Sequence, residues 1–186
     1  MVAFNTEGYR LKFINCRILG NQYTIYTGAK FTRLYFKDCY IDGTTDFSFG
    51  PSTALFEDCI IHSKRNSYVT AASTPKEAKY GYVFKHCKLT AEPGVDKVYL
   101  GGPWLQYAYT VFIECELGKH IVSAGWHNWG KQSNEETARY MEYKNTGEGA
   151  NASERVAWSK QLTKKEAEAV TVDVIFRTQS NWNPID

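Results

Sequence analysis

The chain has 186 residues, of which 43% are hydrophobic, 15% aromatic and 23% charged, as in one folded globular domain and unlike a disordered segment. Its formal net charge of +2 provides no basic field of the kind that attracts nucleic acid. No apolar run approaches the roughly 18 residues of a membrane span, and the first residues show no signal-peptide pattern. We therefore expect no nucleic-acid partner and no membrane partner.

A repeat organises the first two thirds of the chain. The pattern Phe-x-x-Cys-x-(Ile/Leu) occurs five times, and successive cysteines are 23, 20, 28 and 28 residues apart. The five units are Phe13–Ile18, Phe36–Ile41, Phe56–Ile61, Phe84–Leu89 and Phe112–Leu117. This period is typical of one coil of a solenoid, and the short runs of Phe, Tyr, Val, Ile and Thr between turn residues indicate strands.

The cysteines of the repeat are predicted to be structural. Alternate side chains of a strand share a face, so each cysteine points inward with the Ile or Leu two residues later, while the Phe reaches the interior across a bend. Their odd number and the lack of a CxxC pair argue against a zinc site and a closed disulfide framework. We expect one internal ladder without disulfides, made of Cys16, Cys39, Cys59, Cys87 and Cys115.

A leucine-rich repeat is the competing solenoid, because its consensus also ends in an apolar residue, two spacers, Asn or Cys, one spacer and Leu. Residues 31–41 fit that consensus in full, whereas the other units lack apolar residues at its upstream positions. The unequal intervals also imply loops of different length on one side of the solenoid. An all-β, right-handed parallel β-helix that carries functional loops explains these features better.

The remainder of the chain is expected to differ from the repeat. From about residue 131 the Phe-x-x-Cys signature stops, and Asn, Glu, Gly and Ser crowd residues 131–155. Thr163-Lys-Lys-Glu166 is a capping box that predicts a short helix to about Ala169. We therefore predict one domain over 1–186, with coils over about 1–130 and a tail of loops and one short C-terminal helix over about 131–186. The tail would cover an otherwise open coil, because an unpaired sheet edge invites association.

Three segments interrupt the repeat at its loops, and they carry a family resemblance. Residues 22–26 (Gln-Tyr-Thr-Ile-Tyr), 46–50 (Asp-Phe-Ser-Phe-Gly) and 100–104 (Leu-Gly-Gly-Pro-Trp) resemble Gln-Asp-Thr-Leu-Tyr, Asp-Phe-Ile-Phe-Gly and Leu-Gly-Arg-Pro-Trp. These motifs occur, in this order and with similar separations, in the pectin methylesterases (pectinesterases), which are carbohydrate esterases on a right-handed parallel β-helix. Residues 125–129 and 1–4 also resemble the family. The likeness spans nearly the whole chain and matches the second half of the family's catalytic domain.

The resemblance implies a de-esterification site for methylated galacturonan, the backbone polymer of pectin. Asp46 matches the nucleophilic carboxylate, which would attack the ester carbonyl and form an acyl-enzyme intermediate. Gln22 matches a glutamine whose amide stabilises the oxyanion, and Trp104 matches an aromatic platform for a sugar ring. By the same analogy the reaction needs no metal and no organic cofactor, and the protein would act outside the cell or in the periplasm.

The sequence departs from the family at two positions of the catalytic centre. Tyr23 stands where the family has its second aspartate, which serves as general acid and then as base, and a phenol is a very poor base at neutral pH. Gly102 stands where the family has an arginine that orients the nucleophile and keeps it ionised. The family's domain also extends upstream, so a missing amino-terminal segment is an expected partner of this chain.

Three functions are compatible with this pattern. The chain is an esterase of weak or absent activity, a non-catalytic galacturonan-binding remnant, or an interaction solenoid whose amino-terminal end docks a partner segment. Release of methanol separates the first from the others, and affinity for polygalacturonate separates the second from the third.

Overall fold

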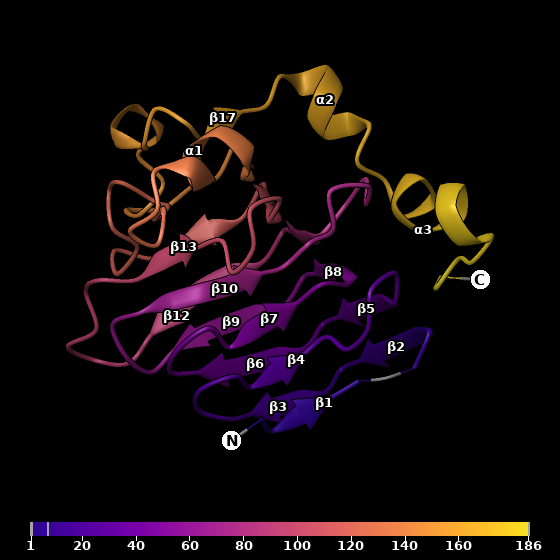
Figure 1. Cartoon of the computed structure of the whole chain (residues 1–186). Helices are drawn as coiled ribbons and strands as arrows, with labels where there is room; N and C mark the ends of the chain where they lie inside the picture. The colour runs from indigo at the N-terminus through magenta and orange to yellow at the C-terminus, as the bar shows by residue number, and fades with distance from the viewer. Residues whose placement is uncertain (1, 7, 186) are drawn as a thin grey trace.

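The protein is a right-handed parallel β-helix, described here by a computed structural model over residues 2–6 and 8–185. Each coil passes in turn through three parallel sheets, which we call A, B and C. Sheet A contains β1 (Phe4–Asn5), β4 (Ile25–Tyr26), β7 (Ser48–Gly50), β10 (Tyr68–Ala72) and β13 (Tyr99–Gly101). Sheet B contains β2 (Arg10–Ile14), β5 (Arg33–Lys37), β8 (Thr53–Glu57), β11 (Tyr82–Lys85), β14 (Tyr109–Ile113), β16 (Arg139–Tyr143) and β17 (Lys160–Gln161). Sheet C contains β3 (Arg17–Leu19), β6 (Tyr40–Gly43), β9 (Ile60–Ser63), β12 (Lys88–Ala91) and β15 (Glu116–Leu117). Figure 1 shows the coils stacked from the amino-terminal end upward.

The bend expected between Phe and Cys is a left-handed residue that joins sheet B to sheet C in every repeat. The residue before each cysteine has a positive φ of 51° to 54°; in order these residues are Asn15, Asp38, Asp58, His86 and Glu114. Asn and Asp tolerate this conformation better than most residues. The bend turns the Phe and the Cys of one unit toward the same interior. The predicted fold class is therefore confirmed.

Exact register stacks the repeat on itself. The Phe residues of β2, β5, β8, β11 and β14 pair directly from strand to strand, with ring centroids 5.0, 4.8, 4.5 and 4.4 Å apart along the stack. Thiols line the adjacent bend and donate weak hydrogen bonds to the Phe carbonyl of the preceding coil, as Cys87 Sγ does to Phe56 O at 3.4 Å. All five cysteines are free. Four are buried, whereas Cys16 is only half-buried because it precedes β3, the edge strand of sheet C.

The coils continue beyond residue 130, where the sequence predicted a tail. Strand β16 pairs in parallel with β14, and its register places Glu142 opposite Phe112. The Asn145 side chain accepts a hydrogen bond from the Cys115 amide at 2.9 Å, and Thr146 bridges Glu116 in sheet C. This sixth coil thus carries Glu and Asn where the repeat carries Phe and Cys. The repeat signature could not detect it for that reason.

A buried ion pair completes this coil. The side chains of Glu142 and Arg155 are each 3% exposed, and Arg155 Nε donates to Glu142 Oε1 at 2.8 Å. Trp126 Nε1 donates to the same carboxylate oxygen at 3.2 Å, and the Trp126 ring stacks on Tyr140 with centroids 4.3 Å apart. Two short elements flank the coil, α1 (Ser133–Thr137) and a 3₁₀ turn over Ala152–Glu154. The carboxylate therefore replaces an aromatic ring and has partners for its charge.

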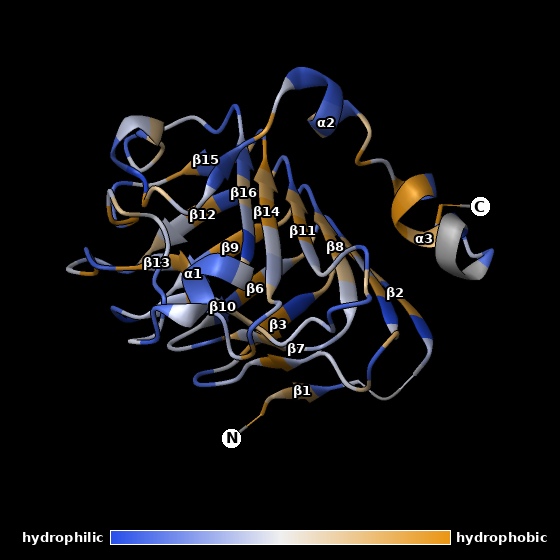
Figure 2. Cartoon of the chain, turned by 45° about the horizontal axis from the view of Figure 1, so that its top comes forward, coloured by the Kyte–Doolittle hydropathy of each residue, from blue (hydrophilic) through white to orange (hydrophobic). Residues whose placement is uncertain are grey.

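The C-terminal helices cover the outer face of sheet B. Helix α2 (Lys164–Glu168) begins at the predicted capping box, in which Thr163 and Glu166 cap each other's backbone amides. A further helix, α3 (Val172–Ser180), follows, and its Ile175 and Phe176 are buried among the outward side chains of sheet B, including Tyr35 and Leu55. Figure 2 shows the apolar part of α3 beside β8. The sequence predicted one helix over an open coil end; the helices pack instead on an apolar sheet face.

No helix in the described part of the chain is long and apolar enough to cross a membrane.

The cysteine ladder predicts selective thiol reactivity. Burial, together with hydrogen bonds along the ladder, raises the pKa of the Cys39, Cys59 and Cys87 thiols, which suppresses the reactive thiolate. Titration of the native protein with a thiol reagent should detect about one fast-reacting thiol, and Cys16→Ser should remove it. Five fast thiols, or a disulfide found by mass spectrometry, would contradict the ladder.

The buried ion pair predicts a large cost when one partner is lost. Arg155→Met leaves the Glu142 carboxylate buried and unpaired, so the free energy of unfolding should fall by roughly 3 to 5 kcal/mol. The matched control is Arg177→Met, which breaks an exposed pair with Asp173 on α3 and should cost less than about 1 kcal/mol. Urea denaturation of the three proteins measures both changes, and equal losses would contradict a buried pair.

Candidate active site

The family-like motifs meet on sheet A because of the same strand register. Ile25 pairs with Ser48 and Ser48 with Thr70, so residues 23, 46 and 68 occupy one position in successive coils. Gln22 forms a parallel bridge with Thr45, the residue before Asp46. The Tyr23 amide donates to Thr45 O at 3.0 Å, and the Asp46 amide donates to Tyr68 O at 2.9 Å. Segments far apart in sequence are thereby fixed side by side.

Asp46 is a buried carboxyl group without a compensating charge. The residue is 4% exposed, and its Oδ1 atom has no hydrogen-bond partner. None of the ion pairs among the described residues includes it. Burial raises the pKa of Asp46 to about 7. Its carboxyl group therefore keeps its proton to a higher pH than an exposed aspartate does.

Gly102 follows β13 and lies beside the ring of Tyr68. A Cβ atom at this position would meet Tyr68 ring carbons at 3.4 Å and a Trp129 ring carbon at 3.6 Å, which is close to ordinary van der Waals contact. Its φ lies outside the left-handed region that favours glycine. The backbone at 102 is therefore compatible with a larger side chain, although the residue present carries no charge to Asp46.

Aromatic rings cover the outer side of sheet A. The Tyr23 ring lies 4.5 Å from Phe49 and 6.3 Å from Trp104, centroid to centroid. Trp104 is 48% exposed and contacts Trp129 edge to face at 5.5 Å. Together with Pro103 and Lys131, these two tryptophans line a hollow of about 350 Å³. Tyr23 and Trp104 are therefore neighbours, as expected if both motifs line one site.

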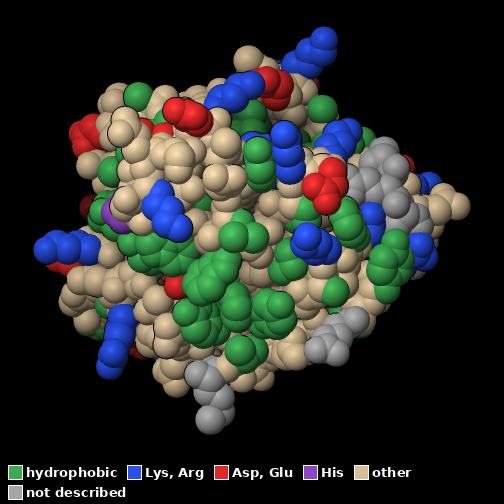
Figure 3. Space-filling model, in the orientation of Figure 1, with side chains coloured by type: hydrophobic (Ala, Val, Ile, Leu, Met, Phe, Trp, Pro, Cys, Tyr) green, Lys and Arg blue, Asp and Glu red, His purple; other side chains and the backbone are tan. Residues whose placement is uncertain are grey.

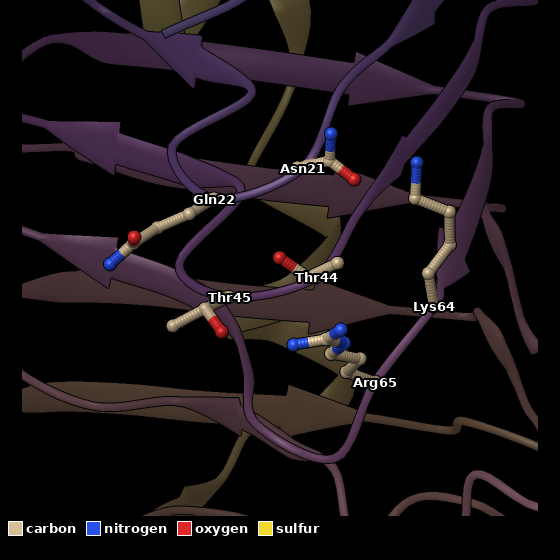
Figure 4. Close-up of a pocket in the computed structure, with 6 residues that line it drawn as sticks. All are labelled: Asn21, Gln22, Thr44, Thr45, Lys64 and Arg65. Carbon is tan, nitrogen blue, oxygen red and sulfur yellow. The ribbon is translucent and has the colours of Figure 1, made fainter. Parts of the chain in front are cut away.

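Gln22 lies at the border of this surface, exposed to solvent. It lines a hollow of about 660 Å³, of a size that holds small ligands, with Asn21, Thr44, Thr45, Lys64 and Arg65. Figure 4 shows the Gln22 amide extending away from Lys64. The Lys64 ammonium pairs with Asp42 at 3.0 Å and also donates to the Gly20 carbonyl. The sequence argument left open a buried structural amide at position 22, and the exposure of this residue excludes that interpretation.

Two further residues, Tyr68 beside Asp46 and His127 beside Tyr68, received no site role from the sequence. Tyr68 occupies the next coil, and its hydroxyl lies 3.1 Å from His127 Nδ1. The same nitrogen accepts the Trp129 amide at 3.0 Å, so the Tyr68 hydroxyl is the donor in its contact with His127. Burial and neighbouring negative groups, Asp46 among them, raise the pKa of Tyr68. Strand pairing places Tyr68 in the column of Asp46, whereas His127 belongs to the family-like segment 125–129 and meets Tyr68 only in the fold.

The described residues contain no group of three or more His, Cys, Asp or Glu side chains arranged to hold a metal ion.

Comparisons with known proteins agree on one family. The family model for pectinesterases matches residues 1–179. Pectinesterase 31 of Arabidopsis thaliana is 42% identical over 167 residues, which make up 89% of this chain and 52% of that protein. The solved pectin methylesterase from carrot has a TM-score of 0.80 and 32% identity, covering 90% of this chain and 56% of the carrot chain. A pectin methylesterase in complex with a hexasaccharide has a TM-score of 0.77 and 29% identity, covering 93% and 58%. The chain thus spans about half the length of its relatives.

Burial of Asp46 predicts a pH-dependent cost to stability. Because the folded pKa is raised above the unfolded value near 3.8, the folded state holds the proton more tightly, and stability falls as pH rises from about 4 through about 7. Asp46→Asn removes this cost, so its stability relative to the original chain should rise over that range by roughly 2 to 4 kcal/mol. Thermal unfolding at pH 4.5 and pH 8 measures the change. Glu148→Gln, at an exposed position, is the control, and parallel pH profiles for Asp46→Asn and the original chain would contradict the burial argument.

Proposed function

Because this chain belongs to the pectinesterase family, we propose that its site binds methyl-esterified galacturonan and hydrolyses the methyl ester slowly through Asp46. The observation that carries the proposal is the buried Asp46 carboxyl with its free Oδ1 atom, in the coil position between Tyr23 and Tyr68 on sheet A. A carboxyl group without a structural partner at such a place is available for chemistry. Galacturonan belongs to cell walls, so the proposed site of action is outside the cell or in the periplasm.

In the proposed reaction the Asp46 carboxylate attacks the ester carbonyl, and the carbon–methoxy bond breaks to give an acyl-enzyme anhydride. The leaving methoxide takes a proton to become methanol, and water then cleaves the anhydride and restores the carboxylate. In this proposal the Gln22 amide donates a hydrogen bond to the oxyanion. The tyrosine at position 23 can donate a proton, but as a phenol it is a poor base for the hydrolytic water at neutral pH.

Two properties of the site limit the proposed rate. Burial raises the pKa of Asp46 to about 7, so protonated carboxyl groups, which cannot attack, persist toward neutral pH. The water-activating base is also missing. General acid–base catalysis contributes roughly 10²- to 10⁴-fold to the rate of a reaction, so its partial loss should slow ester hydrolysis by a factor of this order.

Core residues of the first coil are incompletely buried, which supports a role for an additional chain segment in the proposed activity. Leu11, Phe13, Cys16 and Ile18 are only partly buried, although the equivalent residues of later coils are fully buried. We propose that additional parallel coils stack on β1, β2 and β3 and complete the groove.

Methanol release tests the proposed function. The chain should release methanol from methylated pectin at least about 10²-fold more slowly than a full-length relative, and the rate should increase as pH rises through 7 because Asp46 ionises. Tyr23→Asp or Gly102→Arg alone should recover little, because catalytic groups that act as a unit are non-additive.

The decisive sample is the double variant Tyr23→Asp, Gly102→Arg, measured alone and fused to the amino-terminal half of the carrot relative. We expect substantial recovery only in the fusion, and Asp46→Asn in that fusion is the control that should abolish it. A full rate from the unmodified chain, or recovery that survives Asp46→Asn, would contradict the proposed mechanism.

A further inference from the structure

Tyr23 holds a backbone conformation that a bulky side chain rarely adopts. Its φ is 56°, in the left-handed region, where Asn and Asp are several-fold enriched among non-glycine residues. Such strain persists only where the surroundings hold the residue in place, and it is concentrated at functional sites. Trp129 has the same conformation, with φ of 60°. Phe31, between β4 and β5, also has a positive φ, of 65°, and Asp46, at the equivalent position one coil on from Tyr23, has φ of 46°. The left-handed backbone therefore belongs to this coil position, and the ring contacts of Tyr23 compensate for a bulky residue there.

The Tyr23 ring joins two separate groups of aromatic residues. On one side Phe49 lies 4.8 Å from Tyr26, and on the other Trp104 lies 5.5 Å from Trp129, which lies 5.7 Å from Tyr68. Tyr23 contacts Phe49 at 4.5 Å and Trp104 at 6.3 Å. The result is one aromatic strip, made of Tyr26, Phe49, Tyr23, Trp104, Trp129 and Tyr68. A short acidic side chain at position 23 would leave a gap in its middle.

The strip belongs to the surface and not to the core. Both buried clusters of the β-helix consist of other residues, and the rings of the strip remain partly or largely exposed. Figure 3 shows hydrophobic side chains gathered over the strands of sheet A. A continuous exposed apolar patch of this kind marks a recognition site. Its flat rings suit the C–H face of a sugar.

Charge at the borders of the strip selects the kind of sugar. Lys131 lines the hollow formed by Trp104 and Trp129, and Arg65 lines the hollow beside Gln22. Cations beside aromatic rings fit a polymer that alternates flat sugar faces with carboxylate groups. Replacement of a carboxylate by Tyr23 also removes a negative charge that would repel such a polymer.

We propose that Tyr23 turns the former proton-transfer position into a sugar-stacking position, so that the aromatic strip binds galacturonan, including the unesterified polymer, as a function separate from ester hydrolysis. This inference rests on the proposed function for the identity of the polymer. It does not require any turnover, because unesterified galacturonan contains no methyl ester to cleave.

Binding of polygalacturonate oligomers, measured by calorimetry, tests the inference. Tyr23→Asn removes the ring, adds no charge and suits the left-handed backbone, so it should fold as well as the original chain and bind about 5- to 10-fold more weakly. Tyr23→Phe keeps the ring and should bind within about twofold. Tyr40→Asn, at a half-buried tyrosine on sheet C, is the matched control and should leave the dissociation constant unchanged, while thermal unfolding checks that all variants are folded.

The outcomes separate this inference from the proposed function. If the original chain binds polygalacturonate and Tyr23→Asn binds equally well, the stacking role of Tyr23 is overturned while the esterase proposal stands. If binding follows Tyr23 and methanol release is absent even from the completed fusion, only the esterase proposal fails. If the original chain binds neither esterified nor unesterified galacturonan, the ligand class is wrong and both proposals fail.

Discussion

The structure depends on one recurring constraint, the left-handed residue that turns each coil from sheet B to sheet C at the same place. Because this bend recurs in exact register, identical side chains fall on top of one another, and the Phe stack and the thiol ladder both result. The stack then fixes the register of each coil on the coil before it. The same register holds in sheet A, where it places Tyr23, Asp46 and Tyr68 in one column, although the loops between them differ in length. Repetition in the core therefore determines the geometry of a site that does not itself repeat.

The sequence predicted those parts of the fold in which each coil repeats the same chemistry. The Phe-x-x-Cys pattern located the bend, the interior ladder and the period. It missed the sixth coil, because Glu142 replaces Phe there and its partner Arg155 lies outside any local pattern. It also missed α3, whose Val172, Val174 and Ile175 are β-branched and weak helix formers. Burial of Ile175 and Phe176 against sheet B overrides that local preference, which is a tertiary effect.

The candidate site was predictable in its residues but not in its environment. The motif order identified Gln22, Asp46 and Trp104, and strand pairing places their segments on neighbouring coils of sheet A. The contacts of Tyr23 with Phe49 and Trp104 follow from ring positions that no motif records. The raised pKa of Asp46 likewise depends on burial in three dimensions, and the pairing of Tyr68 with His127 joins residues 59 positions apart. The catalytic roles of these residues remain predictions.

The two departures from the family pattern change the charge of the site in opposite directions. An arginine at 102 would favour the ionised form of Asp46, whereas Gly102 carries no charge and burial alone raises the pKa of that carboxyl. An aspartate at 23 would add a second negative charge, whereas Tyr23 adds a neutral ring to the aromatic strip. Each leaves out a charged group that the family resemblance assigns to the ester reaction: Gly102 lacks a positive charge that would attract a uronate polymer, whereas Tyr23 lacks a negative charge that would repel it. The proposed binding strip and the proposed ester reaction use different groups of the site, so binding and hydrolysis must be measured separately in this chain.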